Sequence, residues 1–150
     1  MVIHGPNLHL LGIREPEVYG HLSLADINAC MVQRASSFNM TLHIKQSNSE
    51  GTLIDHISNH YTSMDALIIN PAALTHTSIA LHDTLRAISI PFIEVHMTQI
   101  AGREAFRQHS YFSAIALGTI SGFGADSYLL ALDALERHLL TQQPRPKETI

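Results

Sequence analysis

The sequence predicts one α/β domain built on a five-stranded parallel sheet with helices on both faces. Short apolar runs alternate with longer amphipathic segments, and strands separated by helices pair in parallel. The chain has 150 residues, a length that suits one domain with a sizeable core rather than two domains. We expect one folded domain over residues 1–140. Residues 141–150 lack apolar periodicity and predict a loose tail.

Each element is predicted from its local pattern. The short apolar runs that indicate strands cover residues 1–3, 41–46, 66–70, 91–95 and 114–120. Apolar residues at helical spacing cover residues 23–38, 50–61, 78–88 and 125–140. Ser23 and Asp26 form a variant of the capping box at the start of the first helix. A shorter helix is expected over residues 101–108, where Arg103 and Arg107 are four residues apart and share a face.

Composition narrows the class of partner. The formal net charge is −4 and no run of Lys or Arg occurs, so neither nucleic acid nor an anionic membrane is expected as a partner. A small molecule is the expected ligand. The single cysteine, Cys30, cannot form an internal disulfide, and no leader or membrane-spanning pattern is visible. We therefore expect a cytoplasmic protein.

Several polar residues follow the predicted strands directly. The loop over residues 5–20 follows the first strand, Asn70 ends the third, and His96 and Thr98 follow the fourth. A parallel α/β sheet binds its ligand at the carboxyl ends of its strands. These three segments are therefore predicted to meet in one crevice.

The loop over residues 5–20 contains Arg14 and Tyr19. A tyrosine acts as a base near neutral pH only if its pKa falls by about two or three units, or about 3 to 4 kcal/mol. One guanidinium about 4 Å away supplies energy of that order. Gly12 and Gly20 give the backbone freedom to close over a ligand. Taken alone, the Arg–Tyr pair also fits an ordinary surface loop, which is the commoner case.

Glu94 and His96 are two residues apart at the end of a predicted strand. Period-two alternation puts both side chains on the same side of the strand. A carboxylate there fixes the imidazole tautomer and raises its basicity, so that His96 can act as a general acid. The alternative is a structural histidine with one satisfied hydrogen bond.

Other catalytic chemistries have weaker support. An imine mechanism needs a desolvated amine in the crevice, but Lys45 lies in a predicted strand and Lys147 in the tail. His56 and His60 are spaced to clamp a metal on one helical face, yet no third ligand follows at a useful spacing. We therefore expect neither a metal nor an organic cofactor.

Several spaced motifs carry a family resemblance. They are Gly-Pro-Asn at 5–7, Gln-Ser-Asn at 46–48, Asn-Pro-Ala-Ala at 70–73, Ile-Glu-Val-His at 93–96, Arg-Glu at 103–104 and Gly-Phe-Gly at 122–124. In this order and spacing the chain resembles type II 3-dehydroquinate dehydratase from the first strand to about Leu139. The resemblance implies a flavodoxin-like fold and a catalytic domain over residues 1–140.

The resemblance also implies a reaction, the anti dehydration of 3-dehydroquinate to 3-dehydroshikimate through an enolate in the shikimate pathway. Tyr19 would remove the proton next to the ketone, and Arg14 would keep Tyr19 ionised. His96, held by Glu94, would protonate the departing hydroxyl. Asn7 would hold a water that stabilises the enolate oxygen, although it also fits a turn after Pro6.

A second group of residues would bind the substrate. The resemblance implies hydroxyl recognition by Asn70, His76 and Arg107, and carboxylate recognition at Met97 and Thr98. It implies that Asp83 reaches the site of a neighbouring subunit, in trimers assembled into a dodecamer. From the residues alone, His76 also fits a bond to its own turn, and Asp83 a solvated helix position. Thr75, Thr77 or Ser78 fits a helix cap.

The chain departs from the family pattern at four places. His4 and His9 stand where the family usually has Asn, Thr98-Gln99 replaces Ser-Asn, and Ala101-Gly102 replaces His-Ala. None of these positions carries a proton transfer, so they bear on substrate affinity more than on reaction type. The rival hypothesis is a noncatalytic module of the same fold that binds a small anion or nucleotide in the crevice.

Overall fold

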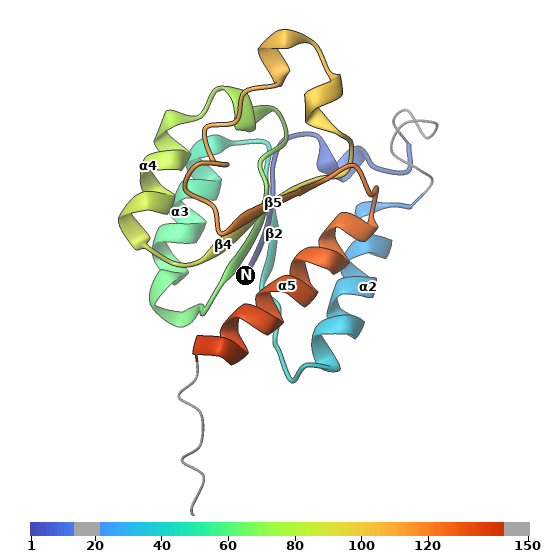
Figure 1. Cartoon of the computed structure of the whole chain (residues 1–150), viewed down its shortest axis with the longest axis vertical. Helices are drawn as coiled ribbons and strands as arrows, with labels where there is room; N and C mark the ends of the chain where they lie inside the picture. The colour runs from blue at the N-terminus through green and yellow to red at the C-terminus, as the bar shows by residue number, and fades with distance from the viewer. Residues whose placement is uncertain (14–21, 143–150) are drawn as a thin grey trace, which may run out of the picture.

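The computed structural model describes residues 1–13 and 22–142. Its five strands form one all-parallel sheet in the order β2-β1-β3-β4-β5 (Figure 1). This is the flavodoxin-like order, so the predicted fold class is confirmed. The strands are β1 (Val2–His4), β2 (Ile44–Gln46), β3 (Leu67–Asn70), β4 (Phe92–His96) and β5 (Gly118–Ser121).

Helices cover both faces of the sheet, as predicted. Helices α2 (Leu24–Ser36) and α5 (Asp126–Gln142) pack against each other on one face. Helices α3 (Glu50–His60) and α4 (Ile79–Ile88) pack together on the other (Figure 1). The helix predicted to end at residue 140 runs to Gln142; residues 143–150 of the predicted tail lie outside the described residues.

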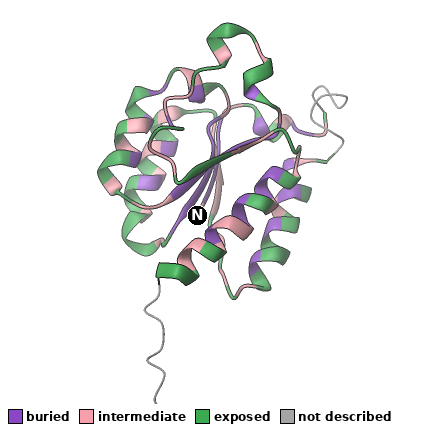
Figure 2. Cartoon of the chain, in the orientation of Figure 1, coloured by how far each residue is buried: buried purple, intermediate pink, exposed green. Residues whose placement is uncertain are grey.

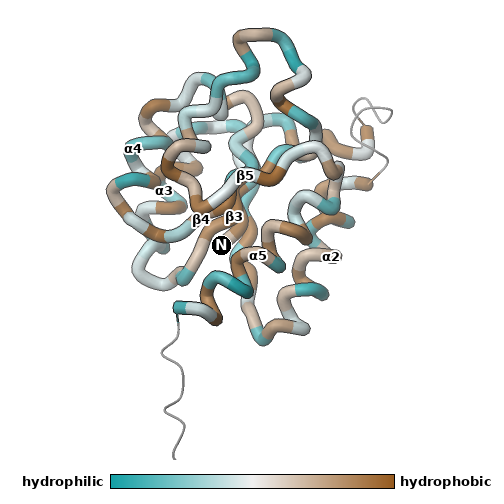
Figure 3. The backbone as a smooth tube through the Cα atoms, in the orientation of Figure 1, coloured by the Kyte–Doolittle hydropathy of each residue, from teal (hydrophilic) through white to brown (hydrophobic). Residues whose placement is uncertain are grey.

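The sheet is buried between two apolar cores, and its middle strands are buried along their whole length (Figure 2). Neighbouring residues of β3 point to opposite faces: Ile68 packs into the core under α2 and α5, whereas Leu67 and Ile69 pack into the core under α3 and α4. The hydropathy colouring marks the same central strands as apolar (Figure 3). Burial on both faces explains why these strands are continuous apolar runs in the sequence.

Serine side chains begin three of the helices. The capping box predicted at Ser23 and Asp26 is present at the start of α2, with each side chain bonded to the other residue's backbone N–H. Ser49 caps α3 and Ser78 caps α4 by a single bond each, in which the serine hydroxyl accepts a backbone N–H. The cap of α4 is therefore Ser78 rather than Thr75 or Thr77.

The helix predicted over residues 101–108 is wrong. The chain forms two separate 3-10 turns there, Ile100–Gly102 and Ala105–Arg107. Arg103 and Glu104 between them have extended backbones, with ψ of −178° and 147°, and one extended residue ends a helical hydrogen-bond series. The last strand is also shorter than the predicted 114–120, because residues 113–115 form a turn before β5.

The end of β1 lies unusually close to the end of β3. The Gly5 N–H donates to the Asn70 carbonyl at 2.8 Å. A Cβ added to Gly5 would lie 2.3 Å from the carbonyl oxygen of Pro71. Only glycine fits at this position, which brings the first loop against the residues that follow β3.

No helix among residues 1–13 and 22–142 is long and apolar enough to cross a membrane.

Candidate active site

A cavity of about 260 Å³ opens at the carboxyl ends of β1, β3 and β4. Its walls come from the first loop, the turn after β3, the end of β4 and the two 3-10 turns that follow. Predicted site residues from all these segments line it, namely Asn7, Asn70, His96, Met97 and Arg107. The structure thus brings together segments that are up to about a hundred residues apart in sequence, as the strand-end rule predicts.

Glu94 and His96 form a buried pair at the end of β4. Period-two alternation puts both side chains on one side of the strand, and His96 Nε2 lies 2.8 Å from Glu94 Oε1. The Glu94 side chain is fully buried and the His96 side chain is 7% exposed. Because a carboxylate only accepts, Nε2 carries the proton in this bond. Nδ1 is then the ring nitrogen that can exchange a proton with a molecule in the cavity.

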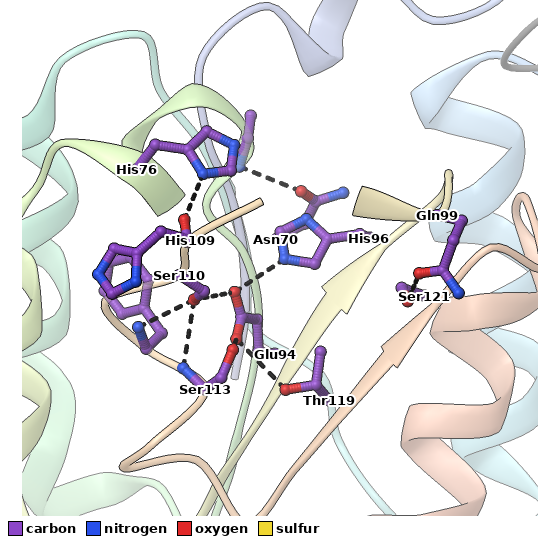
Figure 4. A network of polar contacts seen from close by, with 12 residues as sticks. Asn70, His76, Glu94, His96, Gln99, His109, Ser110, Ser113, Thr119 and Ser121 are labelled. Atoms are coloured by element: carbon purple, nitrogen blue, oxygen red, sulfur yellow. Dashed lines mark hydrogen bonds and ion pairs between the residues drawn. The ribbon is translucent and has the colours of Figure 1, made fainter. Parts of the chain in front are cut away.

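Three hydroxyl groups donate hydrogen bonds to the Glu94 carboxylate (Figure 4). Ser110 Oγ donates to Oε1 at 2.6 Å, while Ser113 Oγ at 2.8 Å and Thr119 Oγ1 at 3.3 Å donate to Oε2. Burial alone would raise the pKa of the Glu94 carboxyl. Hydrogen bonds from His96, Ser110 and Ser113 outweigh burial and hold that pKa below its ordinary value. Glu94 is therefore an ionised carboxylate in a fixed orientation.

Sequence reasoning missed these three hydroxyls. Ser110 and Ser113 belong to a segment without helical or strand periodicity, so its path back to Glu94 has no local signal. Thr119 is the register partner of Glu94 across β4 and β5. Register could have placed Thr119, but only once the two strands had been aligned.

Asn7 and Asn70 lie on the wall of the cavity that faces the first loop. Asn7 has a left-handed backbone, with φ 67°, and begins the 3-10 turn Leu8–Leu10; its N–H donates to Asn48 Oδ1 at 2.9 Å. The turn role expected for Asn7 is therefore present, at a position that also lines the cavity. Asn70 Oδ1 accepts from the Ala72 N–H at 3.1 Å.

Two arginines contribute positive charge to the cavity wall. The Arg103 guanidinium donates to the Thr98 hydroxyl. This bond fixes the orientation of Thr98, the side chain expected to bind a substrate carboxylate. Arg107 lies over the Phe106 ring at 5.0 Å and pairs with Glu104 at 3.3 Å. The predicted site residues did not include Arg103, although it belongs to the quoted Arg-Glu motif. No local pattern in the sequence around Arg103 indicates that the turn folds back over the crevice.

Two other predicted site residues, His76 and Asp83, do not line the cavity. The ring nitrogen Nδ1 of His76 donates to the His109 carbonyl at 2.6 Å (Figure 4). Asp83 is on the exposed side of α4, 69% exposed, with one oxygen 3.0 Å from His82 Nδ1. Asp83 therefore matches its structural alternative, a solvated helix position, whereas His76 bonds to a distant segment rather than to its own turn. Arg14 and Tyr19 lie outside the described residues, so their placement stays a prediction.

The two histidines with metal-clamp spacing pack against each other. The His56 and His60 rings are 4.4 Å apart, and His60 Nδ1 donates to the His56 carbonyl at 2.7 Å. Among residues 1–13 and 22–142, no cluster of three or more His, Cys, Asp or Glu side chains is arranged to hold a metal ion.

The fold and the site define a class of protein. A flavodoxin-like sheet carries a cavity at its strand ends, with a buried carboxylate–imidazole pair on one wall and two arginines on another. A site of this kind suits a small polar or anionic molecule to which a proton is transferred. This is the class of small-molecule acid–base enzymes.

Comparison with known proteins identifies the family. The model of the family "Dehydroquinase class II" matches residues 1–136. The 3-dehydroquinate dehydratase of Legionella pneumophila (strain Corby) is 54% identical over 142 residues, covering 93% of this chain and 97% of that protein. The chain belongs to the class II dehydroquinase family. The resemblance to type II 3-dehydroquinate dehydratase, and the expectation of such an enzyme, are confirmed.

Other relatives agree in sequence and in structure. The 3-dehydroquinate dehydratase of Acinetobacter baumannii (strain AYE) is 55% identical over 139 residues, covering 91% of this chain and 92% of that protein. The crystal structure of type II dehydroquinase from Propionibacterium acnes superimposes with a TM-score of 0.86 at 39% identity, covering 91% of this chain and 94% of that one. The family match therefore extends over nearly the whole described fold.

Proposed function

We propose that this protein dehydrates 3-dehydroquinate to 3-dehydroshikimate by an anti elimination through an enolate. The observation that carries the proposal is the buried Glu94–His96 pair, with Nε2 and Oε1 2.8 Å apart at the wall of the strand-end cavity. The reaction itself is that named for the relatives, and it belongs to the shikimate pathway.

The elimination needs a base and an acid on opposite faces of the substrate. The Tyr19 phenolate, kept ionised by Arg14, removes the proton next to the ketone, and the electron pair moves to the carbonyl oxygen to give an enolate. When the enolate collapses, the carbon–oxygen bond to the hydroxyl breaks. His96 gives that hydroxyl a proton and it leaves as water. Each proton has a side-chain partner, so the proposed steps need neither metal nor organic cofactor.

Glu94 makes His96 suited to this role. A full negative charge on the far side of the ring stabilises the imidazolium from which the proton is given, and the hydroxyls of Ser110 and Ser113 keep the carboxylate from turning away. Asn7, on the cavity wall, holds a water that stabilises the enolate oxygen. A buried, ionised carboxylate behind a cavity histidine is costly in a module that only binds, and this cost favours catalysis.

The remaining predicted residues complete substrate binding. Asn70, His76 and Arg107 bind the substrate hydroxyls, and Met97 and Thr98 bind the carboxylate, next to Arg103. Asp83 lies on the exposed surface of α4 and reaches the site of a neighbouring subunit. With this contact the protein assembles as trimers within a homododecamer. It works in the cytoplasm, with no nucleic-acid or membrane partner.

Turnover by matched tyrosine variants tests the proposal. The conjugated enone product absorbs in the ultraviolet, so turnover of 3-dehydroquinate can be followed directly. Tyr19→Phe should lower kcat by about 10²- to 10⁴-fold, the contribution of a positioned general base. Tyr61→Phe, at a surface tyrosine after α3 that is 46% exposed, should match the unaltered protein.

Two results would count against the proposal. Folded, unaltered protein that forms no enone would favour the noncatalytic binding module. Turnover that survives in Tyr19→Phe would keep the dehydratase but remove Tyr19 as its base. We expect the unaltered protein to form the enone and Tyr19→Phe to lose most of this turnover.

A further inference from the structure

A buried chain of hydrogen bonds runs from α2 to the cavity wall. His4 Nε2 lies 2.9 Å from Asn28 Oδ1, and His4 Nδ1 lies 3.0 Å from the Tyr128 hydroxyl. The same hydroxyl lies 2.9 Å from Asn70 Nδ2. His4 and Tyr128 are fully buried, and Asn70 is 3% exposed. Three elements, β1, α5 and β3, each supply one member of the buried part.

The chemistry of the four groups fixes the direction of every proton. Asn28 Oδ1 only accepts, so His4 Nε2 carries the proton and Nδ1 keeps its lone pair. The Tyr128 O–H therefore donates to Nδ1, and its oxygen is left to accept from an Asn70 N–H. Burial lowers the pKa of His4 to about 4, which agrees with a neutral ring at pH 7.

This direction determines how the Asn70 amide is presented. Its Oδ1 accepts from the Ala72 N–H at 3.1 Å and one Nδ2–H is given to Tyr128. One N–H remains, at a residue that lines the cavity. If His4 did not accept, the Tyr128 hydroxyl proton would turn toward Asn70 and meet another donor. The amide would then lose its bond or rotate its nitrogen against the Ala72 N–H.

We propose that His4 is a positioning residue that, through the Tyr128 hydroxyl, holds the Asn70 amide with an N–H donor toward a substrate hydroxyl. The inference rests on the proposed function only for the identity of the substrate. It gives a role to one of the four departures from the family pattern. The asparagine usual at position 4 also offers an acceptor and a donor, so His4→Asn is the conservative variant.

A kinetic cycle tests the proposal. His4→Leu removes both hydrogen bonds, and KM for 3-dehydroquinate should rise about 5- to 10-fold, the value of one neutral hydrogen bond, while kcat changes less than about twofold. His4→Asn should restore most of the loss. In an Asn70→Ala background His4→Leu should raise KM no further, because both changes remove the same contact.

The opposite pattern would overturn it. Effects of His4→Leu and Asn70→Ala that add, or a lower melting temperature with KM unchanged, would make His4 an ordinary core residue. If His4→Leu does not fold, Tyr128→Phe takes its place in the same cycle, since it removes one oxygen and keeps the ring.

A nuclear magnetic resonance measurement decides the point even without turnover. The ¹⁵N shifts of His4 at pH 7 should be those of a ring protonated at Nε2 and bare at Nδ1, and Tyr128→Phe should shift the Asn70 side-chain amide. A His4 ring protonated at Nδ1, or an Asn70 amide whose chemical shift does not change, would refute the chain of hydrogen bonds. If the protein made no enone, the proposed function would fail while this result still decided the hydrogen-bond direction.

Discussion

Replacing Glu94 by glutamine removes one charge from the buried pair and little else. Oε1 of the glutamine can still accept from His96 and Ser110, at the 2.8 and 2.6 Å distances of the carboxylate. Its NH₂ group would face Ser113 and Thr119, whose hydroxyls can rotate to accept. The variant should therefore fold with the His96 ring in place.

The size of the effect follows from the geometry. With Nε2 and Oε1 2.8 Å apart, the charge centres of an imidazolium and a carboxylate are about 4 Å apart, worth up to about 4 kcal/mol at an effective dielectric near 20. Hydrogen bonds to charged groups give about 1.5 to 3 kcal/mol. The variant loses this stabilisation of the charged ring, and kcat at neutral pH should decrease on the order of 10²-fold, within the usual range for general acid catalysis.

The assay compares initial rates of enone formation by the unaltered protein and Glu94→Gln, with thermal unfolding of both as a check on folding. We expect the large loss in kcat and a small change in KM. A Glu94→Gln protein that keeps kcat within about threefold would refute the argument, because a mechanism that relies on general acid catalysis loses far more.

Three further predictions test the surroundings of the site. Ser113→Ala removes one hydrogen bond of about 1 kcal/mol from the Glu94 carboxylate, so kcat should fall about fivefold in the same assay. Gly5→Ala places a Cβ 2.3 Å from the Pro71 carbonyl oxygen, and urea unfolding should show a loss of about 1 to 3 kcal/mol; the matched Gly51→Ala, where nothing lies within 4 Å, should show none. Because burial lowers the pKa of His4 from 6.5 to about 4, the unfolded chain binds the extra proton between these values. The free energy of unfolding should therefore fall by about 3 kcal/mol as pH drops through this window, and less in His4→Asn; equal slopes would contradict a buried neutral ring.

Local patterns predicted the elements that place the catalytic pair. The apolar runs of β3 and β4 are visible because both faces of these strands are buried, and alternation put Glu94 and His96 on one side before any contact was known. The convergence of Asn70 and His96 followed from the parallel order alone. Both inferences need only short-range regularity, which the chain expresses plainly.

Contacts made by irregular segments could not be predicted. Ser110, Ser113 and Arg103 reach the site from turns whose direction depends on the backbone angles of single residues, such as the extended Arg103 and Glu104. The predicted 101–108 helix failed for the same reason. The His4–Tyr128–Asn70 chain links residues up to 124 positions apart, and no periodicity in the sequence joins them.

The fate of deuterium in stereospecifically labelled 3-dehydroquinate distinguishes an anti from a syn elimination. The substrate carries deuterium in turn at each of the two positions on the carbon next to the ketone. We expect the unaltered protein to remove the label anti to the departing hydroxyl and to keep the label syn to it. Loss of the syn label would contradict a base and an acid on opposite faces of the substrate.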